Sequence, residues 1–531
     1  MRKIFVNGNF YTFDPTKPRA EAVVVESGRF IDMGAADNML LHWKNPDAET
    51  VDLDGKTVTP GLIDSHLHLS AIAHNFLNLD LTGLTSKREI LEKIRNHART
   101  LQKGEWLVGE GWDENLFTDS GIPDISELDH VCPHNPLFMP RICHHAFLVN
   151  SKALELAGYH PEMSTPEGGR IELDDATGKP TGLLLESASE LITRHIPERT
   201  YDELKDALGQ AISYAMARGL TSVHSNDPRF LGGLSRTYNL YDELLNHEQL
   251  GLRCNLLIDY DFLDDLRNEG MYAGFGNETL QIGAVKLFAD GAMGRRTALL
   301  SEPYSDAPDE YGDAVLDKKA LQQIVQKART LSMPVAVHTI GDQALENVLD
   351  VLDQFPSVAY RDRLIHVQVL REELIKRLAA PDRIADIQPR FVASDFPWVQ
   401  DRLGQTRAGR SYAWKTLMNS GVICAGGSDC PVEPIDPLFG IHAAVTRKAP
   451  GQSHAGWNPD ERLSVNEAFR LFTELGAYPT NEEKIKGTIS RGKLADMTVY
   501  SQNPFTLKLP DQLTETEIDM TIIGGSIKHQ R

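Results

Sequence analysis

Between residues 59 and 425 the chain repeats one pattern, a short apolar segment of strand type followed in most cases by a stretch of helical periodicity. Strands that alternate with helices favour βα units and a parallel sheet. The predicted strands lie within residues 59–69, 220–224, 253–258, 282–288, 334–338, 363–366, 384–388 and 422–425. Helical patterns such as 318–331 and 342–354 lie between most of them. Eight such units close a barrel, so the sequence predicts an α/β fold with a (β/α)8 TIM barrel.

One interval breaks this spacing. Between His68 and Leu220 the chain is far too long for a single crossover connection. Helical patterns over residues 87–101 and 201–218, together with loop-rich stretches, occupy the interval. Loops that follow barrel strands lie at the active-site face. We therefore expect this large insertion after the first strand, residues 70–218, to cover the active site as a lid or as one wall of the substrate pocket.

Both ends of the chain show short alternating strands joined by tight turns. Near the N-terminus we predict three hairpins, with turns at Asn7-Gly8, Glu26–Gly28 and Asp54-Gly55. The tail contains similar strand segments at residues 495–500, 518–523 and 526–527. These patterns predict a small β-sandwich built from both termini, residues 1–59 and 476–531, around a barrel domain of residues 60–475.

Composition narrows the choice of partner and compartment. The formal charge of −21 over 531 residues argues against nucleic acid or an anionic membrane as a partner, because both require a basic surface. No apolar run approaches the ~20 residues of a membrane-spanning helix, and the first residues lack a signal-peptide core. The five cysteines are scattered without a CxxC pair, which is typical of reduced thiols. We expect a cytoplasmic protein with a small-molecule substrate, and a homodimer as the commonest symmetric assembly.

Two histidines one residue apart, His66 and His68, end the first predicted barrel strand. Side chains on a strand alternate between its faces, so both imidazoles point the same way and could bind one metal ion. Two hydrogen-bonded histidines in an ordinary core strand would give the same sequence. The pair alone leaves both interpretations open.

Four residues at the ends of later strands extend this pattern, and they are Lys286, His338, His366 and Asp429. Taken singly, each has a structural alternative. Lys286 could be an ion-pair partner and Asp429 a helix N-cap, and the two histidines could be hydrogen-bonded core residues. An unpaired lysine among apolar neighbours is, however, costly to bury. Together with the histidine pair, all four project from the C-terminal rim of the predicted barrel, where catalytic residues of this fold gather. The sequence therefore predicts a metal centre at this rim.

The stretches around these residues resemble the amidohydrolase superfamily of metal-dependent hydrolases. They are most similar to its YtcJ-like branch, which includes N-substituted formamide deformylases. The resemblance covers essentially the whole chain, and its matching stretches are residues 61–68, 285–298, 337–344, 363–368, 388–391, 427–433 and 492–497. It is specific for the branch and much less so for the substrate.

The resemblance implies two divalent metal ions, with zinc as the default for a nitrogen and oxygen ligand set. Their ligands would be His66, His68 and Asp429 for the more buried ion, and His338 and His366 for the other. Lys286, carboxylated by CO₂, would bridge both ions as a carbamate. A hydroxide bridging the metals would attack the substrate, and Asp429 would act as general base and then as general acid.

The sequence evidence for residues that contact the substrate is weaker than that for the metal ligands. Trp112 and His145 lie in insertion stretches that resemble family segments, although Cys143-His144-His145 stands where the family usually has Asp-Gly-His. His224 ends the second strand, and Arg296 could grip a polar or anionic group. The structural alternatives stay open: Trp112 as plain core, His224 as a buried hydrogen-bonded histidine and Arg296 as a surface ion pair.

Three functions compete. The first is hydrolysis of a C–N bond in a small amide, a linear N-acyl or N-formyl compound, by a binuclear metal enzyme. The second is a deaminase acting on a heterocyclic amidine, but superfamily deaminases usually use one metal and lack the lysine that is present here as Lys286. The third is a non-catalytic regulator on the same fold, which would predict eroded ligands, whereas all six are present.

Overall fold

The computed structural model describes residues 2–119, 121–142, 145–160, 163, 166, 168–357 and 359–531. The chain forms two compact units. Met1–Ala71 with Ala211–Arg531 make up one, called the barrel unit below, and Ile72–Gln210 make up the other, called the inserted unit. Among the described helices, none combines the length and the apolar character needed to cross a membrane.

The barrel unit contains the predicted parallel barrel. Its eight strands run in chain order around one sheet and are β8 (Leu62–Leu67), β15 (Leu220–Asn226), β16 (Arg253–Asp259), β17 (Leu280–Phe288), β18 (Val335–Thr339), β19 (Asp362–His366), β20 (Arg383–Ile387) and β21 (Cys424–Gly426). Each strand pairs in parallel with the next. The backbone N–H of Asp429 donates to the His66 carbonyl (2.7 Å), and that of His68 donates to the Cys430 carbonyl (2.9 Å). These bonds join the two ends of the sheet, so the barrel is nearly closed.

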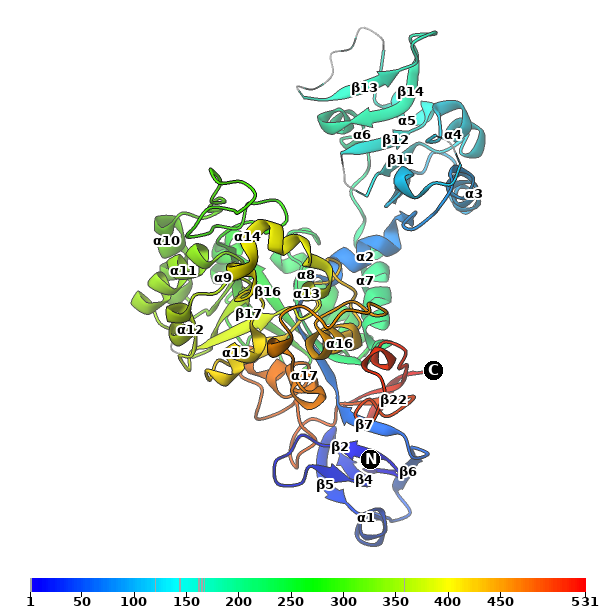
Figure 1. Ribbon diagram of the computed structural model, residues 1–531. Coiled ribbons are helices and arrows are strands. Elements are labelled where there is room, and N and C mark those ends of the chain that lie inside the picture. The colour runs from blue at the N-terminus through cyan, green and yellow to red at the C-terminus, as the bar shows by residue number, and fades with distance from the viewer. Residues whose placement is uncertain are drawn as a thin grey trace. The chain divides into compact units, whose positions relative to one another are not determined.

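Helices cover the outside of this barrel (Figure 1). They include α8 (Leu234–Asp242), α9 (Leu263–Asn268), α10 (Lys318–Thr330), α11 (Asp342–Gln354), α12 (Glu372–Leu378), α14 (Trp398–Ala408), α15 (Trp414–Asn419), α16 (Pro437–Thr446) and α17 (Val465–Leu471). α10 illustrates the local cause. Asp317 caps its N-terminus by accepting from the Ala320 N–H, and Leu321, Val325 and Ala328 form one buried stripe.

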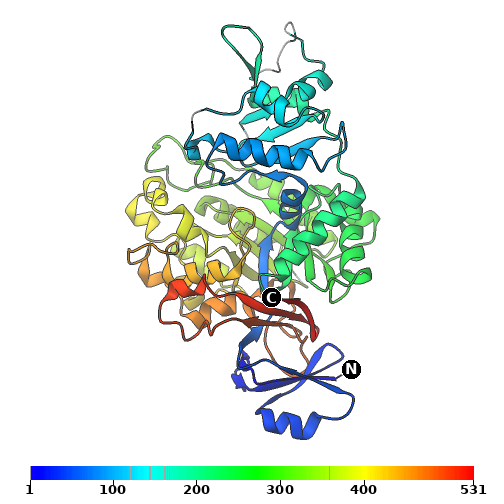
Figure 2. The ribbon, with the colours of Figure 1, turned by 90° about the vertical axis from the view of Figure 1, so that its right-hand side faces the viewer.

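The two chain termini contribute to two packed sheets. One has the strand order β5 (Arg29–Gly34), β4 (Ala22–Glu26), β1 (Arg2–Val6), β6 (Ala48–Asp52). The other has the order β24 (Ser526–Gln530), β23 (Ile518–Ile523), β22 (Met497–Tyr500), β7 (Thr57–Pro60), β2 (Asn9–Tyr11), β3 (Arg19–Ala20). Figure 2 shows the blue N-terminal and red C-terminal strands next to each other. Phe5, Val23, Met497 and Ile522 share one buried apolar cluster between the sheets.

Two of the three predicted hairpins are wrong. Strands β4 and β5 do pair across the Glu26–Gly28 turn. At Asn7-Gly8 and at Asp54-Gly55, however, the chain passes from one sheet to the other, because β1 pairs in parallel with β6 and β2 in parallel with β7. The Gly55 N–H donates to the Asn7 carbonyl (2.7 Å), so the two strands change sheets side by side. Each turn is tight, but it forms a corner of the packed sheets.

The inserted unit has its own sheet and core. Its strands are β13 (Arg170–Leu173), β14 (Pro180–Leu185), β12 (Ala146–Val149), β11 (Leu137–Pro140), β10 (Leu107–Glu110) and β9 (Leu79–Asp80), in sheet order. Helices α3 (Lys87–Ala98), α4 (Ile125–Val131), α5 (Ser151–Leu156) and α6 (Glu190–Thr193) accompany the sheet, and α7 (Tyr201–Met216) leads back toward the barrel strands. The sequence pattern indicated α3 and α7 but missed this sheet.

Candidate metal centre

The first barrel strand supplies two histidines from a buried segment. β8 is buried along its whole length, and His66 is 1% exposed. On the same strand, the Asp64 carboxylate accepts hydrogen bonds from the backbone N–H groups of His66 (3.0 Å) and Ser428 (3.1 Å). Burial raises the pKa of Asp64 to about 7. Asp64 thus ties the His66 end of β8 to the segment that follows β21.

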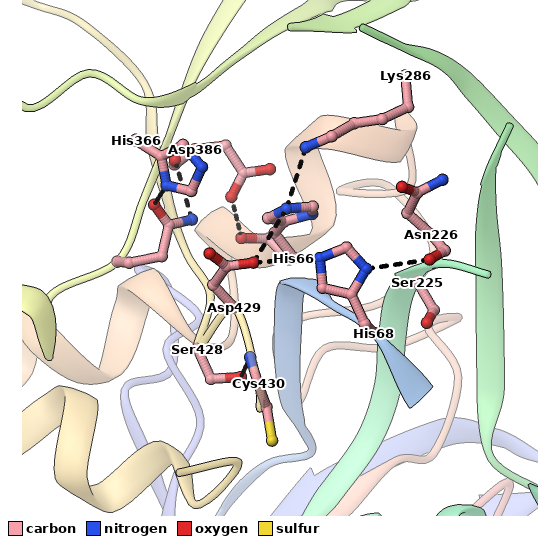
Figure 3. A network of polar contacts seen from close by, with 12 residues as sticks. His66, His68, Ser225, Asn226, Lys286, His366, Asp386, Ser428, Asp429 and Cys430 are labelled. Carbon is pink, nitrogen blue, oxygen red and sulfur yellow. Dashed lines mark hydrogen bonds and ion pairs between the residues drawn. The ribbon is translucent and has the colours of Figure 1, made fainter. Parts of the chain in front are cut away.

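Asp429 belongs to that segment and meets both histidines (Figure 3). Its Oδ1 lies 3.4 Å from His66 Nε2 and 3.3 Å from His68 Nε2. The backbone φ of Asp429 is 57°, in the left-handed region where non-glycine residues are uncommon and where functional sites store strain. Burial alone would raise the pKa of Asp429, but the hydrogen bond from His68 and the neighbouring cationic groups outweigh burial and lower it. The carboxyl group is therefore ionised at neutral pH.

Lys286 reaches the same group from β17. It is 1% exposed, its Nζ lies 3.2 Å from His66 Nε2, and the Phe288 ring centre lies 4.9 Å from Nζ. In the part of the chain that the structure describes, no carboxylate forms an ion pair with this amine. Burial lowers the pKa of Lys286 to about 8. The neutral amine, which is the form that reacts with CO₂, is therefore accessible close to neutral pH.

The remaining two histidines lie side by side at the ends of β18 and β19. The ring centres of His338 and His366 are 4.5 Å apart, and the His366 ring centre lies 6.0 Å from that of His66. Burial lowers the pKa of His366 to about 4 and holds the pKa of His338 well below its usual value. Both rings are neutral at pH 7, so each offers a lone pair. The structure thus brings all six ligand-type residues of the sequence prediction into one contiguous group.

This group fits a divalent metal ion. His66, His366 and Asp429 each place one ligand atom within 4.8 Å of the others. The ring nitrogen of His66 that faces this group is Nε2, at 3.4 Å from Asp429 Oδ1. Neutral imidazoles with a carboxylate form a ligand set that suits zinc and related transition metals.

Backbone carbonyl groups determine which ring nitrogen is free in two of the histidines. His68 Nδ1 lies 3.0 Å from the Asn226 carbonyl oxygen, and His338 Nε2 lies 3.0 Å from that of Gly291. A carbonyl oxygen can only accept, so these two nitrogens carry the protons. The neutral His338 ring therefore has its lone pair on Nδ1, and the neutral form of His68 has its lone pair on Nε2. Burial lowers the pKa of His68, but the hydrogen bond to Asp429 and the charge of that carboxylate outweigh burial and raise it, so a metal ion at Nε2 would displace a proton. Metal-binding histidines are commonly oriented by outer partners of this kind.

Two proposed substrate contacts belong to the inserted unit. Trp112 is 1% exposed within the core of that unit, and its indole Nε1 donates to the Met139 carbonyl (2.7 Å). His145 is exposed, with Nδ1 2.9 Å from an oxygen of Glu186. The neighbouring Cys143 and His144, where the sequence departs from the family pattern, lie outside the described residues.

The other two proposed contacts belong to the barrel unit. His224 is fully buried on β15, where burial and then the charge of Arg363 hold its pKa well below the usual value. Arg296 forms an ion pair with Asp306, at 3.1 Å from Nε and 2.9 Å from Nη2. These contacts are those of the ion pair that was the structural alternative for Arg296.

Sequence reasoning missed the residues that orient the ligands. Asn226 and Gly291 act through backbone carbonyl groups, which any residue type could supply, so no sequence signal identifies them. Asp64 stands between the strand start and the histidine pair, and a carboxylate in such an apolar run was a detectable signal. Gln388 directly follows β20, and its Oε1 lies 2.7 Å from His366 Nδ1. It occurs in one of the stretches that resemble the superfamily, where no role was assigned to it.

Comparison with known proteins finds relatives that match this chain over nearly its whole length. The chain is 42% identical to the YtcJ protein of Bacillus subtilis (strain 168), with 100% of both proteins covered. It is 32% identical to the protein LONG AFTER FAR-RED 3 of Arabidopsis thaliana, with 98% of this chain and 90% of that protein covered. It is also 27% identical to the N-substituted formamide deformylase of Arthrobacter pascens, over 99% of this chain and 98% of that enzyme.

Structure comparison agrees with these relatives. The crystal structure of a metal-dependent hydrolase from Pyrococcus furiosus matches with a TM-score of 0.78 and 29% identity, covering 95% of this chain and 100% of that one. A model of the amidohydrolase family matches residues 49–529, which include the barrel, the inserted unit and the C-terminal strands. On these grounds the chain belongs to the amidohydrolase family.

Proposed function

We propose that this protein hydrolyses the C–N bond of a small-molecule amide in a metal-dependent reaction. The observation that carries the proposal is the convergence of six side chains at one end of the barrel, namely His66, His68, Lys286, His338, His366 and Asp429. Family membership and the full-length relationship to an N-substituted formamide deformylase support it.

Two divalent ions, with zinc as the default, are the proposed cofactors. His66, His68 and Asp429 would hold one ion, His338 and His366 the other, and Lys286 would join both as a carbamate formed with CO₂. When bound, the ions supply Lewis acidity and lower the pKa of a water molecule. The lowered pKa values of His66, His338, His366 and Lys286 and the ionised carboxylate of Asp429 favour the protonation states that these roles require.

Asp429 is the proposed proton carrier. Its ionised carboxylate would take a proton from the attacking water and pass it to the amide nitrogen as the C–N bond breaks. Without that proton the nitrogen would have to leave as a strongly basic anion. The left-handed backbone of Asp429 and its contacts with His66 and His68 fix the position from which it acts.

Linear N-formyl and short N-acyl amines are the proposed substrates. The printed activity of the Arthrobacter pascens relative points to an N-substituted formamide. Lys286 argues against a deaminase with a single metal ion, because such a site has no use for a bridging group.

A substrate panel tests this function. The purified protein, loaded with zinc, would be assayed for amine release from N-formyl, N-acyl and cyclic amides and for ammonia release from heterocyclic amidines. We expect turnover of a linear amide that stops with a chelator and returns with metal. Turnover of amidines alone would identify a deaminase instead, and metal-independent turnover would contradict the proposal. If Lys286→Ala kept both ions and full activity, the bridging carbamate would be wrong.

A further inference from the structure

We infer that Gln388 is a positioning residue of the metal centre, whose amide oxygen fixes His366 in the tautomer that leaves Nε2 free for a metal ion. Its role as a metal-site residue rests on the function proposed above, whereas the tautomer itself does not. Gln388 is 1% exposed and directly follows β20, and its Oε1 lies 2.7 Å from His366 Nδ1.

The orientation of the Gln388 amide follows from its other contact. Its Nε2 donates to the backbone carbonyl of Asp386, at 3.2 Å. Because a carbonyl oxygen only accepts, the end of the amide that faces Asp386 must be the NH₂ group. The end that faces His366 is then the amide oxygen, which also only accepts. Nδ1 of the neutral His366 ring therefore carries the proton, and Nε2 carries the lone pair.

Asp386, whose backbone carbonyl orients Gln388, is held in place inside the barrel by its own side chain. The Asp386 carboxylate accepts from Ser65 Oγ at 2.5 Å and from Arg363 Nε at 3.0 Å, and Arg363 also contacts the Ser65 carbonyl. All three residues are at most 1% exposed. Ser65 precedes His66 on β8, and Arg363 lies on the strand that ends in His366. One buried ion pair thus connects the support of Gln388 to two ligand-bearing strands.

The His366 ring needs a partner that tells its two edges apart. Phe391 stacks on the ring with centres 5.8 Å apart and planes 14° apart, which fixes the plane of the imidazole. A 180° rotation of the ring about the bond that joins it to Cβ would keep the stacking, but it would put a ring carbon where Nδ1 now lies. The backbone φ of His366 is 75°, so its side chain leaves the strand in an unusual direction. The hydrogen bond that His366 Nδ1 donates to Gln388 Oε1 is directional and selects one orientation.

Binding of zinc in competition with a chelator tests the role. In Gln388→Leu we expect one of the two ions to bind about 10- to 100-fold more weakly, as is common when an outer partner of a ligand is lost, and the other to change little. Gln388→Glu keeps an acceptor for Nδ1 but loses the N–H that binds the Asp386 carbonyl, so we expect its zinc affinity to lie between those of wild type and Gln388→Leu. Gln368→Leu is the matched control, since Gln368 is 2% exposed, lies two residues beyond His366 and has an amide oxygen without a partner among the described residues. Equal affinities in wild type and Gln388→Leu would overturn the inference.

A second measurement does not depend on the folding of Gln388→Leu. Nitrogen-15 spectra of labelled histidines in the metal-free wild type, with His366 assigned through His366→Gln, report the tautomer directly. We expect the proton on Nδ1, and a proton on Nε2 would contradict the inference. If the tautomer is as expected but wild type binds no zinc, the proposed function and the metal-site role of Gln388 fail, while its control of the His366 tautomer stands.

Discussion

The two halves of the candidate metal centre are held in different ways. His66, His68 and Asp429 contact one another, with the carboxylate oxygen 3.3–3.4 Å from both rings. His338 and His366 are instead oriented by oxygens outside the ligand group, from Gly291 and Gln388. The first half is organised by its own carboxylate, with an outside contact from the Asn226 carbonyl oxygen to His68 Nδ1. The second depends on neighbours, so substitutions around the ligands should disturb it more.

Replacing Asp429 should have the largest effect, because it removes the group that organises the first half. Asp429→Asn keeps the size of the side chain but cannot accept and return a proton. We expect turnover to fall about 10²- to 10⁴-fold, the usual range for general acid–base catalysis. Steady-state kinetics with elemental analysis would check this. Near-normal turnover with metals retained would assign the proton transfer to another group.

The ion pair between Arg363 and Asp386 connects the two halves through β8, β19 and β20. Arg363→Leu leaves a buried carboxylate without its cation, so we expect a loss of about 3–5 kcal/mol in the free energy of unfolding. Urea unfolding of the metal-free protein measures it. Lys376→Ala, which breaks an exposed pair with Glu372 on α12, is the control and should show no measurable change. Equal stability of both variants would refute the connecting role.

The pH dependence of stability isolates His366 in the second half. Its pKa is about 4 in the folded protein and about 6.5 when unfolded, so the unfolded chain binds more protons between these values. Stability therefore falls as pH falls through this window, by about 2 kcal/mol between pH 6.5 and 5. Asp64, with its raised pKa, acts in the opposite direction over the whole of this range. The test is thus the difference in slope between metal-free wild type and His366→Gln, and equal slopes would contradict it.

Arg296 should give the smallest effect, since it belongs to neither half. Its partner Asp306 also pairs with Arg402, so this carboxylate keeps a cation when Arg296 is replaced. We expect Arg296→Gln to leave the melting temperature and kcat/KM unchanged within error. A tenfold rise in KM would instead make Arg296 a substrate contact.

The sequence predicted the barrel and pointed to the six side chains at its rim because both depend on local patterns in the chain. Apolar strands alternate with amphipathic helices, and ligand types such as His338 and His366 stand at strand ends. The corners at Asn7-Gly8 and Asp54-Gly55 were mistaken for hairpins, because a tight turn carries the same signal whether the next strand pairs back or enters another sheet. The parallel pairing of β1 with β6 is long-range and has no local signature.

The orientation of the proposed ligands could not be predicted from the sequence, because it too depends on contacts between distant parts of the chain. His68 and His338 rely on backbone carbonyl oxygens, which do not depend on residue type. Gln388 acts through an amide whose direction is defined only once Asp386 is placed beside it. The sequence did not predict the sheet of the inserted unit because its strands are only two to six residues long.

Metal content tests the central claim most directly. Protein purified without chelator and loaded with zinc in the presence of bicarbonate should contain two ions per chain by elemental analysis. That result would support a centre in which Lys286 joins two halves. One ion per chain would contradict the two-metal account and favour a mononuclear deaminase, and none would remove the metal centre altogether.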